Sequence, residues 1–223
     1  MSDDRHEREL RQALLETVRR LEEKGYNHGS SGNVSVRLGE DILITPTGAH
    51  SANLTAERMV RLRRDGSQVG DGIPSSEWHM HLSIMRARPE VNALIHTHAD
   101  CCVALSCLGK PIPAFHYMIA GFGGNDIPCA SYATFGTPEL AESAIAALSD
   151  RKGCLLANHG MIVVGQDLAA AFSLAVKMET LARQYILACQ AGTPEIIRDE
   201  EMQRVKMQYA GYGKARLPQP GAR

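Results

Sequence analysis

The sequence lacks the features that would place the chain in a membrane or an oxidising compartment. None of its 223 residues belongs to a run of 18 apolar residues, which excludes an ordinary transmembrane helix. Its six cysteines form no Cys-x-x-Cys pair and no framework like that of small disulfide-bonded proteins. The polar N-terminal segment is followed by no apolar core of a signal peptide. We therefore expect a cytoplasmic protein with reduced cysteines and no membrane partner.

The sequence also lacks a strong charge bias. It has 24 basic and 25 acidic residues and a formal net charge of -1, so no global field attracts nucleic acid. Its 44% hydrophobic and 22% charged residues are typical of a globular protein with a sizeable core. Internal repeats and low-complexity blocks are missing too. We predict a single domain over residues 1–213, a mobile tail over 214–223 and no nucleic-acid partner.

Hydrophobic patterning predicts a mixture of helices and short strands. Apolar residues at helical spacing predict helices over residues 6–24, 137–149, 168–190 and 199–209, and another beginning before Trp78. Apolar or alternating runs predict strands over 34–38, 42–44, 91–98 and 154–165, and a hairpin over 59–69. Residues 111–136 mix glycine, proline and aromatic residues, which favours irregular structure or short strands. The pattern indicates an α/β fold.

The strand predicted over residues 91–98 ends in a histidine pair. His96 and His98 are separated by one residue, so in a strand their side chains share one face. Two neighbouring imidazoles provide half of a metal site. For the pair alone, the polar end of a strand is an equally good interpretation.

A third histidine interrupts the other long apolar run. His159 lies within Asn158-His159-Gly160, between apolar residues on both sides. Burying an imidazole is unfavourable unless it is hydrogen-bonded or ligates a metal, so His159 is our candidate for the third ligand. Three histidines with an open position form a catalytic zinc arrangement, and zinc so held acts as a Lewis acid on a carbonyl oxygen.

Three short polar segments are candidates for binding an anion. Two loops rich in Gly, Ser, Thr and Asn, residues 29–33 and 45–48, flank predicted strands that bring them to one sheet edge. The third segment is Ser75-Ser76, at the start of the helix near Trp78, where unpaired N–H groups suit a phosphate. Each loop taken alone is also compatible with an ordinary turn.

Glu77 follows these serines in the first turn of the predicted helix. A carboxylate there complements the helix dipole, which for first-turn glutamates in general is the better interpretation. Beside a metal it could instead abstract or return a proton.

Together these segments resemble the class II aldolase/adducin family, which includes L-fuculose-phosphate aldolase, over about residues 8–213. The resemblance is carried by Ser31-Gly32-Asn33-Val34-Ser35, Leu43-Ile44-Thr45-Pro46-Thr47-Gly48, Ser75-Ser76-Glu77, His96-Thr97-His98, the run 123–136, and Ala157-Asn158-His159-Gly160. It implies a three-layer α/β/α fold with a central, mostly antiparallel sheet. It also implies a zinc-dependent lyase that cleaves a ketose 1-phosphate to dihydroxyacetone phosphate and an aldehyde, in a homotetramer with active sites between subunits.

The resemblance assigns a role to each candidate residue. It makes Glu77 a metal-contacting acid/base and Tyr117 a proton donor from the neighbouring subunit, and it favours Tyr212 over Tyr209 as the tyrosine that closes the site. The zinc ligands are His96, His98 and His159, with Mn2+ or Co2+ as other possible metals, and the phosphate pocket comprises Asn33, Thr47, Gly48, Ser75 and Ser76.

Several activities fit this resemblance. L-fuculose 1-phosphate is the first candidate substrate, and 5-deoxyribulose or methylthioribulose 1-phosphate is the alternative. The family also contains 4-epimerases, which resemble this chain but carry aspartate where Glu77 stands, as well as dehydratases and decarboxylases. The non-catalytic adducin head domain is a remote alternative, because such a domain has no need of ligands, base and phosphate loops together.

Overall fold

A computed structural model describes residues 2–211. Tyr212 and the tail predicted over residues 214–223 lie outside the described residues. Within the described part, no helix is both long enough and apolar enough to cross a bilayer.

A central eight-stranded sheet organises the molecule, in the order β4-β3-β2-β1-β5-β10-β9-β8. Among the described strands every neighbouring pair in this sheet is antiparallel except β8 and β9, which are parallel. The strands are β1 (Asn33–Leu38), β2 (Asp41–Ile44), β3 (Val60–Leu62), β4 (Gln68–Val69), β5 (Ala93–Thr97), β8 (Cys129–Ala130), β9 (Gly153–Leu156) and β10 (Gly160–Gly165), and a separate pair is β6 (Ile112–Pro113) with β7 (Asp126–Ile127). The mostly antiparallel sheet confirms the prediction.

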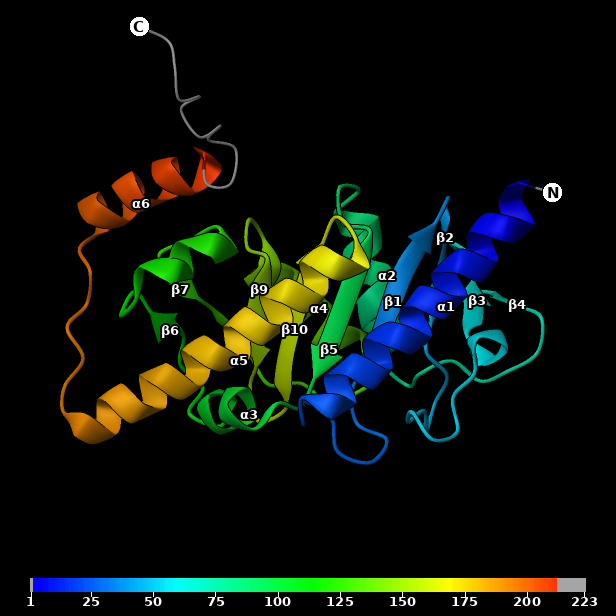
Figure 1. The fold of residues 1–223 in the computed structure, drawn as a ribbon, viewed down its shortest axis with the longest axis horizontal. Helices are drawn as coiled ribbons and strands as arrows, with labels where there is room; N and C mark the ends of the chain where they lie inside the picture. The colour runs from blue at the N-terminus through cyan, green and yellow to red at the C-terminus, as the bar shows by residue number, and fades with distance from the viewer. Residues whose placement is uncertain (1, 212–223) are drawn as a thin grey trace, which may run out of the picture.

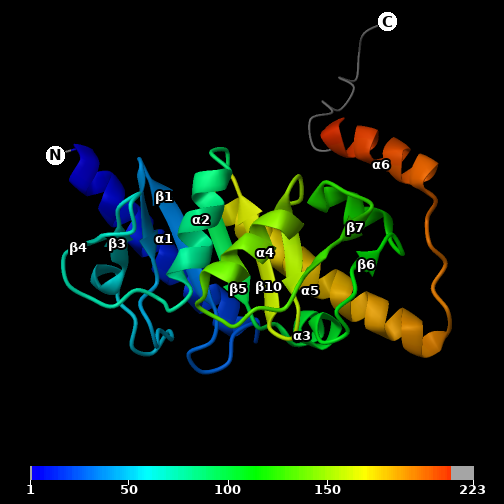
Figure 2. The same cartoon turned by 180° about the vertical axis from the view of Figure 1, so that it is seen from behind.

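Helices cover both faces of this sheet, which makes three layers. In Figure 1, α1 and α5 cross the face towards the viewer, and Figure 2 shows α2 and α4 on the opposite face. The helices are α1 (Ser2–Glu23), α2 (Trp78–Ala87), α3 (Asp100–Ser106), α4 (Pro138–Leu148), α5 (Leu168–Ala191) and α6 (Asp199–Gly211), with 3-10 turns η1 (Ala56–Arg58) and η2 (Tyr117–Phe122). Helix α6 lies away from the sheet and packs on η2.

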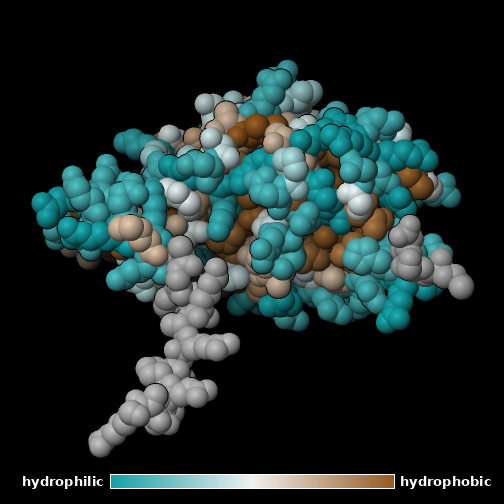
Figure 3. Space-filling model, turned by 90° about the horizontal axis from the view of Figure 1, so that it is seen from above, coloured by the Kyte–Doolittle hydropathy of each residue, from teal (hydrophilic) through white to brown (hydrophobic). Residues whose placement is uncertain are grey.

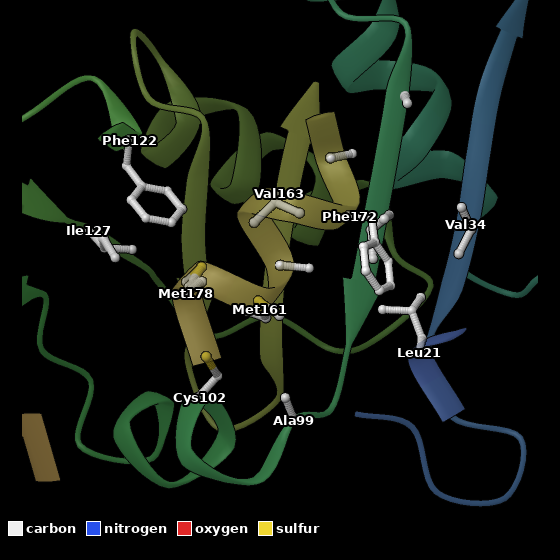
Figure 4. Close-up of a cluster of buried hydrophobic side chains, with 14 of the residues drawn as sticks. Leu21, Val34, Ala99, Cys102, Phe122, Ile127, Met161, Val163, Phe172 and Met178 are labelled. Atoms are coloured by element: carbon white, nitrogen blue, oxygen red, sulfur yellow. The ribbon is translucent and has the colours of Figure 1, made fainter. Parts of the chain in front are cut away.

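Strand alternation divides the core into two clusters, one on each face. Figure 4 shows part of the larger one, where Val34 and Val163 from the sheet meet Phe172 and Met178 of α5 and Leu21 of α1. The neighbouring sheet residues point the other way, towards α2 and α4. The site described below lies on this second face.

Local signals fixed several helix ends as predicted. Thr137 caps α4 through a side-chain oxygen that accepts from the Leu140 N–H, and a proline follows it at the first helical position. Asp167 caps α5 in the same way. The hairpin predicted over residues 59–69 is the pair β3 and β4. The segment 111–136 contains only strands of two residues and the turn η2, as its glycines and prolines indicated.

Candidate metal centre and active-site cavity

Three imidazoles converge beside the ends of the central strands. His96 lies in β5, His98 follows that strand directly, and His159 lies between β9 and β10. One ring nitrogen of each histidine lies within 4.8 Å of the others, and the Nε2 atoms of His96 and His98 are 3.0 Å apart. The structure therefore brings together the three histidines that the sequence singled out.

The backbone around His159 corrects one detail of the sequence interpretation. The run 154–165 is not an interrupted strand but a hairpin, and His159 lies in its tight turn rather than in the sheet interior. Asn158 adopts a left-handed conformation, with φ of 55°. A Cβ atom on Gly160 would stand 2.5 Å from the Thr97 carbonyl oxygen, so only glycine lets the turn approach β5 closely.

Glu77 completes the cluster from the beginning of helix α2. It is the N-cap residue of α2, with φ of -99° and ψ of 15°, and not a first-turn residue as predicted. Its side chain is buried; Oε2 lies 3.2 Å from Nε2 of His96, and Oε1 lies 3.4 Å from Nε2 of His159. Oε1 has no hydrogen-bond partner among the described residues.

A series of hydrogen bonds between buried polar side chains holds the Glu77 carboxylate in position. Asn33 Nδ2 donates to Glu77 Oε2 over 2.9 Å, and His81 Nε2 lies 2.5 Å from Asn33 Oδ1. Ser35 Oγ lies 2.7 Å from Nδ1 of the same imidazole. His81 and Ser35 were not among the residues predicted from the sequence to belong to the site. His81 stands three residues after Trp78 and four before Met85, on the apolar stripe of α2, and this position signals a buried imidazole.

The protonation states of Glu77 and of two of the histidines suit the binding of a cation. Burial alone would raise the pKa of the Glu77 carboxyl, but the adjacent His96 imidazole holds that pKa well below its usual value. Burial would lower the pKa of His96, and the Glu77 carboxylate outweighs it and raises that pKa. Burial and the neighbouring His96 lower the pKa values of His98 and His159 to about 4. These two imidazoles are therefore neutral at pH 7, the form that ligates metals.

This donor set fits a divalent cation. Neutral imidazole nitrogens suit zinc and other borderline metals, and the buried Glu77 carboxylate beside them supplies a negative charge that compensates a cation. His96 would keep its orientation, because its Nδ1 lies 2.8 Å from the Met161 carbonyl oxygen and leaves Nε2 for the ion.

A cavity of about 410 Å³ opens onto this cluster. The polar loops predicted to bind an anion form much of its wall, and the structure brings them together with His98, His159 and Glu77. Tyr132 and Phe135 add an aromatic part of the wall that no sequence prediction had placed in the site; both side chains are 65% exposed. The lining loop residues are Ser30, Ser31, Gly32, Asn33, Pro46, Thr47, Gly48, Ser75 and Ser76.

Tyr117 lies outside this cavity. It begins η2 and is 52% exposed, and its ring stacks on His116 and lies 6.5 Å from the ring of Tyr209 in α6. The cavity wall within one chain does not include Tyr117. Its role, like that of Tyr212, stays a prediction.

The fold and the cluster together define a metal-dependent α/β enzyme whose ligands converge at the strand ends. Residues 12–186 match the model of the family described as Class II Aldolase and Adducin N-terminal domain, and the chain belongs to this family. It is a class II, metal-dependent phosphosugar aldolase, an aldehyde-lyase.

Relatives and solved structures agree with this membership. The chain is 49% identical to the 5-methylthioribulose-1-phosphate/5-deoxyribulose-1-phosphate aldolase of Rhodospirillum rubrum over 214 residues, covering 96% of this chain and 97% of that protein. It is 42% identical to the L-fuculose phosphate aldolase of Escherichia coli strain K12 over 205 residues, covering 92% and 95%. A solved L-fuculose 1-phosphate aldolase superposes with a TM-score of 0.87 at 38% identity, covering 91% of this chain and 96% of that one.

Proposed function

We propose that this aldolase cleaves 5-methylthioribulose 1-phosphate or 5-deoxyribulose 1-phosphate to dihydroxyacetone phosphate and a two-carbon aldehyde that carries the methylthio group or a hydrogen. The 49% identity to the Rhodospirillum rubrum aldolase, against 42% to the Escherichia coli L-fuculose phosphate aldolase, carries this choice. L-fuculose 1-phosphate, the first candidate from the sequence resemblance, becomes the second candidate.

The aromatic part of the cavity wall supports the same choice. Phe135 and Ala133 offer no hydrogen-bonding side-chain group, and Phe135 is largely exposed to the cavity and solvent. A methyl or methylthio group gains free energy by covering such a surface. On this part of the wall Tyr132 alone carries a side-chain hydroxyl, so the hydroxyl of the aldehyde released from L-fuculose 1-phosphate would have to reach that group to offset its loss of water.

The polar loops anchor the phosphate in this proposal. Thr47, Gly48, Ser75 and Ser76 line one cavity with Glu77, and they offer hydroxyl groups and main-chain N–H groups to an anion. Asn33 uses one hydrogen of Nδ2 for Glu77, which leaves the second for a substrate oxygen.

Glu77 carries the proton in the proposed reaction. Cleavage transfers the proton of the C4 hydroxyl to the oxygen that we assign to Tyr117 of a neighbouring subunit, which enters the step as a phenolate, breaks the C3–C4 bond and forms the aldehyde. The electron pair left on the dihydroxyacetone phosphate fragment takes a proton at carbon from Glu77, which enters the step protonated, and proton exchange with water then returns both groups to their starting states. In the synthetic direction the ionised Glu77 removes that proton. A divalent cation held by His96, His98 and His159, which we propose to be Zn2+ with Mn2+ or Co2+ as substitutes, polarises the substrate carbonyl when bound.

Tyr117 exchanges the proton of the aldehyde oxygen in this proposal, from a neighbouring subunit. Its exposed position outside the cavity of its own chain supports a role in trans. Large side chains are exposed on η2 and on the elements that contact it or adjoin them: Tyr117 in η2, Leu187 in α5, Ile196 before α6 and Met207 in α6. Figure 3, seen from above, shows that the end of the molecule on which α6 lies is mostly hydrophilic at its surface, so the exposed apolar side chains there are set among polar ones. Such a face suits subunit contact, and we propose the homotetramer that the sequence resemblance implied.

The decisive experiment compares substrates directly. The zinc-loaded protein is offered 5-methylthioribulose 1-phosphate, 5-deoxyribulose 1-phosphate and L-fuculose 1-phosphate, and dihydroxyacetone phosphate release is measured. We expect kcat/KM for the first two to exceed that for L-fuculose 1-phosphate by about tenfold or more, the scale of one well-buried apolar group. A preference for L-fuculose 1-phosphate would overturn the choice of substrate.

Pentulose 5-phosphates serve as the control for the epimerase alternative. Inversion at C4 without release of dihydroxyacetone phosphate would contradict the proposal. A purified protein that binds neither divalent metal nor any ketose phosphate would instead support the adducin-like alternative.

A further inference from the structure

We infer that His81 is a positioning residue for proton transfer: it fixes the Asn33 amide, which holds Oε2 of Glu77 and leaves Oε1 to exchange the proton. The inference deepens the proposed function and rests on the acid/base role of Glu77. It assigns different tasks to the two oxygens of one carboxylate. Oε1, without a hydrogen-bond partner among the described residues, is the reactive one.

Backbone geometry builds this arrangement. Asn33 and Ser35 are two residues apart in β1, so their side chains share one face of the sheet. The register of β1 and β5 sets Asn33 opposite His96. His81 enters from α2 and bridges Asn33 and Ser35, at 2.5 Å and 2.7 Å, on a side chain with no exposed surface. Strand β1 and helix α2 therefore meet at one imidazole, and β5 places His96 on the other side of Asn33.

The Glu77 carboxylate fixes the direction of all three hydrogen bonds that link Glu77, Asn33, His81 and Ser35. An ionised Glu77 only accepts, so the group of Asn33 that faces it is the N–H donor. Asn33 therefore presents its oxygen to His81, and His81 Nε2 carries a hydrogen. Nδ1 of His81 is then an acceptor, and the Ser35 hydroxyl donates to it. Only one tautomer of a neutral His81 satisfies all four side chains.

These hydrogen bonds do more than satisfy buried polar groups, because they hold the Glu77 carboxylate in position. If His81 lost its Nε2 hydrogen, the Asn33 oxygen would face a second acceptor, and the amide would gain free energy by turning over. The turned amide would set an oxygen against Glu77 Oε2, and like partial charges would displace the carboxylate. The three metal-binding histidines make no hydrogen bond to His81, so each would keep its own partners while the carboxylate moved.

Three substitutions at His81 separate positioning from folding. The amide nitrogen of glutamine stands the same number of bonds from Cβ as Nε2, so His81→Gln keeps the donor to Asn33. His81→Asn reaches only as far as Nδ1, and His81→Leu removes both groups. We expect kcat to stay within about threefold of wild type for His81→Gln and to fall about 10- to 100-fold for the other two, with KM little changed.

Two measurements accompany the kinetics. Zinc content is determined for each variant, and we expect it to match wild type. The exchange of the carbon-bound proton of dihydroxyacetone phosphate in D2O, followed by NMR, reports on Glu77 without the aldehyde. His79, on the same helix, is the matched control; it stacks on Trp78, and His79→Gln and His79→Leu should leave exchange unchanged.

The tautomer gives a readout independent of activity. Nitrogen-15 spectra of histidine-labelled wild-type protein should show His81 as a neutral imidazole protonated at Nε2. The Nδ1 tautomer would overturn the inference, as would His81→Leu with wild-type exchange or equal losses in the glutamine and asparagine variants. If wild-type protein does not exchange the proton at all, the proposed function fails, and the tautomer still decides the direction of the hydrogen bonds.

Discussion

The metal cluster and the Tyr117 region differ in burial and in how completely one chain builds them. The cluster is self-contained: its imidazoles and carboxylate come from β5, the hairpin turn and α2 of one chain, and Glu77 is only 5% exposed. Tyr117 is half exposed and lies outside the cavity wall of its own chain. The difference teaches that groups that bind a cation are preorganised by the monomer fold, whereas the proposed proton exchange at the aldehyde depends on assembly.

Removing the base from the metal cluster should produce the largest loss of turnover. Glu77→Gln keeps shape and the hydrogen bond from Asn33 but cannot accept a proton, so we expect kcat to fall about 10³-fold. Metal content, measured by elemental analysis, should stay at the wild-type level. Near-normal turnover in this variant would move the base to another residue.

Tyr117→Phe tests the half that depends on assembly. We expect kcat to fall about 10²-fold, the typical scale for losing one acid/base group. Co-expression of Glu77→Gln and Tyr117→Phe subunits should then restore about one quarter of wild-type activity, because random mixing in a ring pairs an intact Glu77 with an intact neighbouring Tyr117 in that share of sites. Recovery no greater than the mean of the two parent variants would place both groups in one chain.

The sequence predicted the centre of the site better than its surroundings. Alternation placed His96 and His98 on one face, and broken apolarity revealed His159, although a hairpin turn and a strand interruption look alike in one dimension. Glu77 was recognised by its neighbours Ser75 and Ser76, while its position as N-cap needed backbone angles.

Other features could not be read from the sequence, because they depend on contacts between distant elements. The bond from Asn33 to Glu77 joins residues 44 positions apart, and the bonds that bridge Ser35, His81 and Asn33 join residues 46 and 48 apart. No local pattern encodes which partners meet. The placement of Tyr132 and Phe135 in the cavity wall likewise follows from the course of an irregular segment. The fold class was accessible because it depends on periodicity and on the resemblance.

Acidification should destabilise the folded protein through the buried imidazole of His81, which lies beside the metal cluster and not in the Tyr117 region. Burial, with a contribution from His96, lowers the pKa of His81 from 6.5 to about 3. The unfolded state therefore binds a proton that the folded state does not, and stability falls as the pH drops below 6.5. Between pH 7 and 5 we expect wild type to lose about 2 kcal/mol relative to His81→Gln. Denaturant unfolding of the metal-free proteins measures this; parallel curves would contradict it.

The phosphate loops should show the smallest effect. Ser76 lines the cavity without a role in the metal cluster. Ser76→Ala removes one hydrogen bond to a charged group, so we expect KM for the ketose phosphate to rise about tenfold with kcat little changed. Steady-state kinetics measures both constants. An unchanged KM would remove Ser76 from the phosphate pocket.

The most direct test of the metal centre is a crystal of the zinc-loaded protein measured on both sides of the zinc absorption edge. The structure predicts a single strong anomalous peak per chain between the ring nitrogens of His96, His98 and His159, beside the Glu77 carboxylate. The peak should vanish in His98→Ala and persist in Glu77→Gln. An anomalous map without a peak between these three side chains would contradict the account.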